Sequence, residues 1–239
     1  MVDLLALCED GSLLAFRSDR PAEVRRVEPH GLSGRLIGID RRPADGQLYG
    51  VTTTNEVYRI DPKSGEGKLA SSLTVPFDGD VRSGVDFNPQ ADRLRLVSRD
   101  GQNLRVNVTL GATAVDGALR YRDDDPGAGK RPRITAGAYT HNIPNAPDTK
   151  LFEIDEERDV LVLQDPPNDG VLTTVGPLGV DFGPLGGFDI VTDAAGHDEG
   201  YAASGATLYS IDLTTGAARA LGTIGDGHAS VVGLAALAP

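Results

Sequence analysis

The chain has 239 residues, including 30 glycines and 15 prolines, and a formal net charge of −12 at pH 7. This length suits one large all-β domain or two small ones, and an apolar content of 39% is enough for a buried core. The acidic balance argues against nucleic acid and anionic membranes as partners. The single cysteine, Cys8, excludes an internal disulfide and a thiolate cluster, and its alternating context predicts a buried, inert thiol.

The N-terminal segment "MVDLLALCEDG" carries acidic residues early and lacks the basic and cleavable apolar regions of a signal peptide. No apolar stretch is long enough to span a bilayer. We therefore expect a cytoplasmic protein without a membrane partner.

A short glycine-led motif recurs along the chain about every 50 residues, which is the spacing of a structural repeat. It occurs as "GID" at Gly38, "GVD" at Gly84, "GAY" at Gly137, "GFD" at Gly187 and "GLA" at Gly233. The residues after Gly233 and those before Gly38 together complete a fifth interval of similar length. The two ends of the chain are therefore expected to share one unit.

Each unit continues with three further strand-like runs. The second runs are "DLLALC", "QLYGVT", "DRLRLVS", "KLFEI" and "EGYAAS"; the third are "SLLAF", "NEVYRID", "NLRVNV", "DVLVLQ" and "ATLYSID". The fourth, more polar runs are "AEVRRVE", "EGKLAS", "ATAVDG", "GVLTTVG" and "GAARALG". Alternation of apolar and polar residues indicates half-buried strands, and a polar fourth strand suits an exposed edge.

These patterns predict an all-β fold, a five-bladed β-propeller with four antiparallel strands per blade in a single domain, residues 1–239. Approximate blades are 35–81, 82–133, 134–185, 186–229, and 230–239 together with 1–34. In that last blade the C-terminal "VVGLAAL" forms the innermost strand beside three N-terminal strands.

Several stretches carry a family resemblance: "GVDFNPQADRLRLVSRDGQNLRVNVTLGATAVDGAL" (84–119), "AYTHN" (138–142), "DPPNDGVLTTVGPLGVDF" (165–182), "GFDI" (187–190) and "LYSIDLTTGAARALGTIG" (208–225). They resemble the bacterial family known as domain of unknown function 4394, and "GVDFNP" and "GQNLRVN" are the most specific parts. The resemblance covers roughly residues 35–235. It implies a propeller-like fold and no established activity, and many relatives look secreted.

In a propeller, the loops that cross from an outermost strand to the next blade converge on one face, where ligands usually bind. The candidate ligand-binding residues in these crossing loops are His30, Asp80, Arg82, Arg133, Asp181 and His228. His30 and His228 enter neighbouring blades, so we expect them to approach each other near the mouth of the axis. With a carboxylate such as Asp80 or Asp181 they would suit a transition metal.

The same face offers an oxygen-only set, Asp78, Asp80 and Asp226, which would suit calcium or another divalent cation. The competing interpretation is that these are solvated loop residues with no bound metal, because none has the local spacing of a ligand motif.

The loops of the opposite face follow Asp40, Asp86 and Asp189, and "NPQAD" begins at Asn88. A ring of carboxylates is one interpretation, and it would need a cation because converging acids disfavour full ionisation. We favour caps on the backbone amides of tight turns. The longest insertion, residues 120–133, carries three acids and then three bases, and is either a flap whose halves attract each other or a solvated loop.

No catalytic motif emerges. The chain has no tryptophan, 6 tyrosines and 6 phenylalanines, few for the sugar platforms of a glycosidase, and it lacks a nucleophile elbow and a phosphate loop. We predict a monomeric, rigid, non-catalytic scaffold that binds a small molecule or a protein. The alternatives are a metal-dependent hydrolase or lactonase at the axial mouth, whose cation would acidify bound water, and a structural module of a larger assembly.

Overall fold

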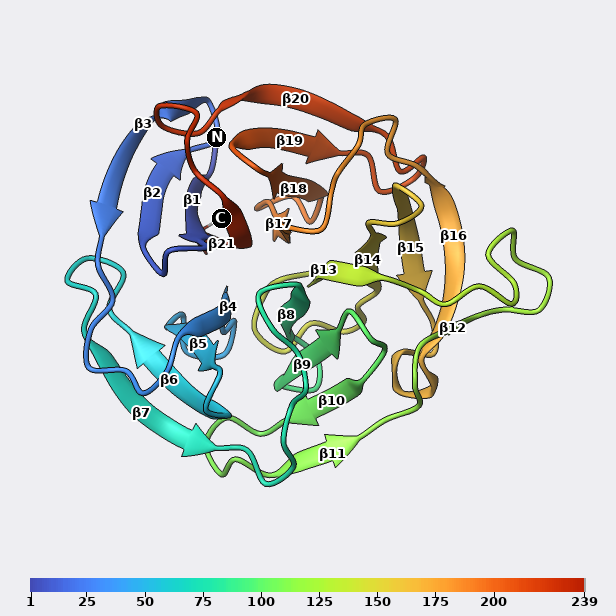
Figure 1. Ribbon diagram of the computed structural model, residues 1–239, viewed down its shortest axis with the longest axis horizontal. Helices are drawn as coiled ribbons and strands as arrows, with labels where there is room; N and C mark the ends of the chain where they lie inside the picture. The colour runs from blue at the N-terminus through green and yellow to red at the C-terminus, as the bar shows by residue number, and fades with distance from the viewer. Residues whose placement is uncertain (239) are drawn as a thin grey trace.

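The computed structural model describes residues 1–238 and forms a ring of five sheets around a central axis (Figure 1). This confirms the predicted five-bladed β-propeller. The one helix in this part of the chain is a short 3₁₀ turn, η1 (Pro167–Asp169). Within the described residues, no helix has the length and apolar character needed to cross a membrane.

Each blade places its innermost strand at the axis, and the other strands follow outward. The innermost strands are β21 (Val231–Ala238), β4 (Leu36–Arg41), β8 (Ser83–Asn88), β13 (Ile134–Tyr139) and β17 (Gly186–Thr192). The second strands are β1 (Asp3–Cys8), β5 (Leu48–Thr52), β9 (Arg93–Ser98), β14 (Leu151–Asp155) and β18 (Asp198–Ser204). We number the blades 1 to 5 in this order.

The outer half of each blade contains its third and fourth strands. The third strands are β2 (Leu13–Arg17), β6 (Glu56–Ile60), β10 (Asn103–Val106), β15 (Val160–Gln164) and β19 (Thr207–Ile211). The fourth strands, outermost in every blade except blade 4, are β3 (Arg20–Val27), β7 (Gly67–Ser72), β11 (Thr113–Val115), β16 (Val171–Pro177) and β20 (Ala218–Thr223). Most residues of these outermost strands are at least partly exposed, as expected for polar edges that discourage pairing with other molecules.

The two chain ends close the ring inside blade 1. β21 pairs antiparallel with β1, with Leu5 opposite Ala235 and Ala6 opposite Leu234. Figure 1 shows β21, in red, between the axis and β1, in blue. This confirms the predicted closure, in which the last strand of the chain is the innermost strand of the blade that the N-terminus begins.

Residues 120–133 form neither a flap with attracting halves nor a fully solvated loop. β12 (Arg120–Tyr121) pairs in parallel with β16 and adds a fifth strand to blade 4. Asp125 is buried and accepts hydrogen bonds from the Gly127 and Thr174 amides. The basic half turns elsewhere, because Arg131 and Arg133 both pair with Asp100.

The core lies between neighbouring blades rather than in one central cluster. Between blades 2 and 3, for example, the Tyr49 and Phe87 rings meet edge to face with centroids 5.4 Å apart. The alternation seen in the sequence places one apolar row of each strand against each neighbouring blade.

The recurring glycines lie where innermost strands approach one another. A Cβ on Gly187 would stand 2.4 Å from both the Gly233 carbonyl carbon and the Leu234 amide nitrogen. A Cβ on Gly38 would stand 2.3 Å from a methyl group of Val85. The repeat therefore needs glycine because five strands share a narrow axis, and the space left among them has a volume of only about 10 Å³.

We predict that Gly187→Ala destabilises the protein by about 1 to 3 kcal/mol or more, because backbone atoms cannot move away from the new methyl group. Gly233→Ala is the matched control at the same axis, since its Cβ would meet Leu7 at an ordinary 3.4 Å. Urea unfolding should find the control within about 1 kcal/mol of the parent protein. Equal losses in the two variants would contradict this account of the axis.

Candidate functional site

Three carboxylates converge at the axis, toward the face opposite the crossing loops. Asp40, Asp86 and Asp189 belong to innermost strands β4, β8 and β17, and all are buried. One oxygen from each lies within 4.8 Å of the other two. The "GID", "GVD" and "GFD" repeats thus supply the same position in three blades, whereas Tyr139 and Ala235 occupy it in the other two.

Each of these carboxylates ties its own blade to the next one. The bonds run from the Phe87 amide to Asp40 (2.7 Å), from the Tyr139 amide to Asp86 (2.8 Å) and from the Ala236 amide to Asp189 (2.6 Å). Asp40 and Asp189 also accept the amides of the residues that follow them, both at 2.6 Å. Five of the six carboxylate oxygens therefore accept a backbone N–H, which makes the cluster a clamp between strands.

The surroundings favour the protonated form of these acids. Burial raises the pKa of Asp189 to about 7, although the amides of Ala236 and Ile190 and the Arg41 guanidinium act in the opposite direction. Burial, and then the charge of neighbouring acids in the cluster, raises the pKa of Asp40 and of Asp86 well above the usual range. Buried like charges of this kind are relieved by retained protons.

The preferred interpretation of these aspartates as turn caps was wrong, because the amides that they bind belong to strands, in the next blade and, for Asp40 and Asp189, also in their own strand. Asn88 does cap a turn, with its side-chain oxygen accepting the Gln90 and Ala91 amides. The spacing of the repeat contained the relevant signal, since equivalent residues of innermost strands must meet at the axis.

The interface between blades 3 and 4 holds a polar network that the sequence patterns do not predict. Arg95, 3% exposed, donates hydrogen bonds to Tyr139, Asn103, Asp116 and Asn168. The one available signal was an arginine at an inward-facing position of "RLRLVS". These bonds fix the stacking of the two blades with directional contacts in addition to apolar packing.

Glu153 lies in the same interface without a hydrogen-bond partner for either carboxylate oxygen among the described residues. It is fully buried, and burial raises its pKa to about 8, while Arg95 acts in the opposite direction. A neutral carboxylic acid is therefore its main form at neutral pH.

Three of the predicted ligand-binding residues lie in ion pairs on the crossing-loop face. Asp80 and Arg82 pair with each other, and the Arg82 guanidinium holds the pKa of Asp80 below its usual range. Arg133 pairs with Asp100 and Glu157. The charges of these loops thus neutralise one another locally.

The two predicted histidines line adjoining hollows beside blade 1. His228, together with Asp226, lines a hollow of about 860 Å³. His30 lines a smaller one of about 210 Å³, and both hollows include Asp10 and Arg35. The two hollows therefore share part of their walls, and neither is lined by a residue that lines the small space at the axis.

The remaining predicted residues do not join a common metal site. Asp78, Asp80 and Asp226 come from two different crossing loops, and within residues 1–238 the axial aspartates alone form a group of three ligand atoms within 4.8 Å. Asp181 is exposed. Metal binding on the crossing-loop face stays a prediction.

Comparison with protein families matches residues 12–235 to the family described as Domain of unknown function (DUF4394). The chain belongs to this family. Comparison with curated proteins gives no significant match.

Solved structures similar to this DUF4394 protein include three from Bacteroides. A protein of unknown function from Bacteroides thetaiotaomicron VPI-5482 has 18% identity and a TM-score of 0.53, covering 96% of this chain and 57% of its own. One of unknown function from Bacteroides caccae has 11% identity and a TM-score of 0.48, covering 95% and 74%. An auxiliary nutrient binding protein from Bacteroides ovatus ATCC 8483 has 13% identity and a TM-score of 0.48, covering 86% and 55%.

The first of these likenesses shows a shared fold and nothing more at that identity. The DUF4394 chain spans less than two thirds of the length of that protein. The function of this chain therefore has to be argued from its own residues.

The buried acids predict that this DUF4394 protein loses stability as the pH rises from about 5 to about 8. Their pKa values are higher in the folded than in the unfolded chain, so the folded chain binds more protons in this pH range. The free energy of unfolding therefore falls as the pH rises toward the pKa values of the folded chain. Asp189→Asn should make the slope of unfolding free energy against pH shallower, by up to about 1.4 kcal/mol per pH unit.

Urea titrations at several pH values measure this slope, with Asp123→Asn as the control at an exposed carboxyl. His141, whose pKa is raised by Asp148 and Asp198, contributes in the same direction, so the difference between variants is the informative quantity. A slope unchanged by Asp189→Asn would contradict the assignment.

Proposed function

We propose that this protein is a rigid, non-catalytic scaffold that binds a small molecule or a protein segment on its crossing-loop face. The observation that carries the proposal is the hollow of about 860 Å³ beside blade 1, a volume typical of ligand sites. Its walls are the turn between β1 and β2, strand β3 and the loop that enters β21.

The hollow combines an apolar floor with a polar rim. Leu14, Val24 and Ala229 supply apolar surface, and Val24 is 37% exposed. The charged lining residues nearly balance, with Glu9, Asp10 and Asp226 against Arg26 and Arg35, and Arg26 pairs directly with Asp10. This arrangement favours a ligand without net charge, or an apolar side chain of a peptide.

The reactive groups nearby support binding rather than chemistry. Burial raises the pKa of the Cys8 thiol, which lowers its reactivity. Asp10 accepts hydrogen bonds from the Ser12 amide and hydroxyl and from Arg26, and these bring its pKa to about 2. A carboxylate so firmly ionised is a poor general base, because proton abstraction works best with a pKa near the working pH.

The walls of the hollow are held in place before any ligand arrives. The Glu9 amide donates to the Ser230 carbonyl (2.7 Å), and the Ser230 hydroxyl donates to the Glu9 carboxylate (3.1 Å). These bonds join the β1–β2 turn to the loop that enters β21. A preformed site loses less entropy on binding than a mobile one.

We predict that neutral apolar fragments, screened by NMR, shift the amide signals of residues 225–230 and of the β1–β2 turn. Val24→Glu should weaken this binding about tenfold or more, because it places a charge in the apolar floor. Val115→Glu is the matched control, since Val115 is 64% exposed on another outermost strand.

A turnover screen against esters, lactones and glycosides completes the test. If the protein is a non-catalytic scaffold, we expect no turnover above that of the buffer. Catalysis that His30→Ala or Asp80→Asn abolishes would contradict the non-catalytic function, and fragments that bind both valine variants equally would contradict the site.

A further inference from the structure

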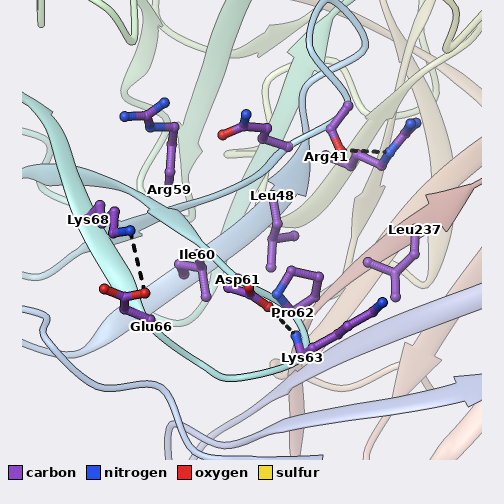
Figure 2. A pocket seen from close by; sticks show the side chains of 12 residues that line it. Arg41, Leu48, Arg59, Ile60, Asp61, Pro62, Lys63, Glu66, Lys68 and Leu237 are labelled. Carbon is purple, nitrogen blue, oxygen red and sulfur yellow. Dashed lines mark hydrogen bonds and ion pairs between the residues drawn. The ribbon is translucent and has the colours of Figure 1, made fainter.

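A second hollow lies between blades 1 and 2 on the face opposite the crossing loops (Figure 2). Its volume is about 630 Å³. The β4–β5 loop, the β6–β7 turn and Leu237 of the closing strand β21 form its walls. It therefore spans the seam where the closed ring brings the end of the chain against blade 2.

Cationic side chains predominate around this hollow in a protein of net charge −12. The lining includes Arg41, Arg59, Lys63 and Lys68, against the two acids Asp61 and Glu66. Within residues 1–238, the side chains of Arg41, Arg59 and Lys63 form no ion pair, whereas Lys68 lies 3.5 Å from Glu66. Asp61 is engaged in its turn, where one oxygen accepts the Lys63 and Ser64 amides.

Two of these cations are held opposite each other. Arg59 on β6 and Lys68 on β7 are directly paired in the strand register. Like charges at such positions destabilise a sheet. Blade 3 avoids the problem at the equivalent position, where Arg105 precedes its turn by the same distance as Arg59 and pairs with Asp116 at 2.6 Å. In blade 2, Glu66 pairs with Lys68, but Arg59 has no ion-pair partner among residues 1–238, so the positive charge of Arg59 remains available to a ligand.

The floor of the hollow is apolar. Leu48 and Ile60 are 2% and 3% exposed, and Pro62 and Leu237 are half-buried beside them. Figure 2 shows Leu48, Ile60 and Pro62 lying between Arg59 on one side and Leu237 on the other. A ligand in this hollow would contact charge at the edges and hydrocarbon at the centre.

Hydrogen bonds hold the walls of the hollow in position. The Arg41 side chain donates to the Gly46 carbonyl at 3.2 Å. Arg25, from blade 1, donates to the carbonyls of Pro62 (3.1 Å) and Lys63 (3.3 Å) in the β6–β7 turn. The turn that carries Lys63 is thus tied to the neighbouring blade, and the site is formed before any ligand binds.

From these observations we propose that the hollow between blades 1 and 2 binds a small organic carboxylate with an apolar body. The carboxylate faces Arg41 and Lys63, and the apolar body lies on Leu48, Ile60 and Leu237. Arginine and lysine form strong charge-assisted hydrogen bonds with carboxylates. This site goes beyond the proposed function, because it lies on the other face of the ring and takes a ligand of different charge.

The test is an NMR titration of the full chain with 2-naphthoate, compared with the neutral isostere 2-naphthamide. Naphthoate should shift the amide signals of Gln47, Leu48, Lys63 and Leu237. It should bind about tenfold or more tightly than naphthamide at low salt, and added NaCl should reduce the difference. Inorganic phosphate, which has no apolar body, should bind more weakly than naphthoate.

A variant pair then tests the charge itself. Lys63→Ala should weaken naphthoate binding about threefold to fivefold, the effect of losing one exposed ion pair. Lys130→Ala removes the same charge from an exposed position outside the hollow and should leave the affinity unchanged. Both lysines are exposed, so neither change threatens folding.

Four outcomes would overturn the proposal: no binding of naphthoate, equal affinity for naphthamide, equal affinity for phosphate, or equal effects of the two lysine variants. Shifts confined to residues 225–230 would also overturn it while supporting the crossing-loop site. The two proposals therefore fail independently.

Discussion

The pairing of β21 with β1 is the constraint on which the rest of the structure depends. A propeller has no central core, so each blade is stable only while both neighbours cover its faces. In this chain the last strand must insert between β1 and the axis before blades 1, 2 and 5 are complete. Leu234 and Ala236 of β21 pack in the cluster between blades 5 and 1, and Val232 and Ala235 pack in the cluster toward blade 2.

The same seam forms both hollows. The crossing-loop hollow takes one wall from the loop that enters β21, and the cationic hollow takes Leu237 from its far end. Asp189 extends the connection, since it accepts the Ala236 amide and thereby fastens blade 5 to the closing strand. Closure of the ring and formation of the binding surfaces are therefore one structural event.

Strand order, blade number and closure could be predicted because they follow from local alternation and from a repeat whose period is visible. The function of the axial aspartates was harder to predict, because Asp40 and the Phe87 amide lie 47 positions apart and their meeting depends on how the blades tilt. The polar network around Arg95 is similar, since Asn168 lies 73 positions further along.

The hollows were beyond prediction for another reason. Loop topology places a residue on a face, but whether its charge is free or paired depends on the conformation of its loop and on partners in neighbouring segments. The sequence predicts that Asp80, Arg82 and Arg133 are charged loop residues, but it does not predict that Asp80 pairs with Arg82, or that Arg133 pairs with Asp100 and Glu157. The sequence pattern does not single out Arg59 and Lys68, because their direct opposition depends on the register of β6 and β7.

Native-state hydrogen exchange of the intact chain tests the closure most directly. If β21 is an integral part of the ring, its amides should exchange only through global unfolding, with the same opening free energy as the amides of β1 and β18. Exchange of β21 about 100-fold faster than that of β18, at an opening free energy about 2.7 kcal/mol lower, would show that the last strand detaches alone and would contradict the account.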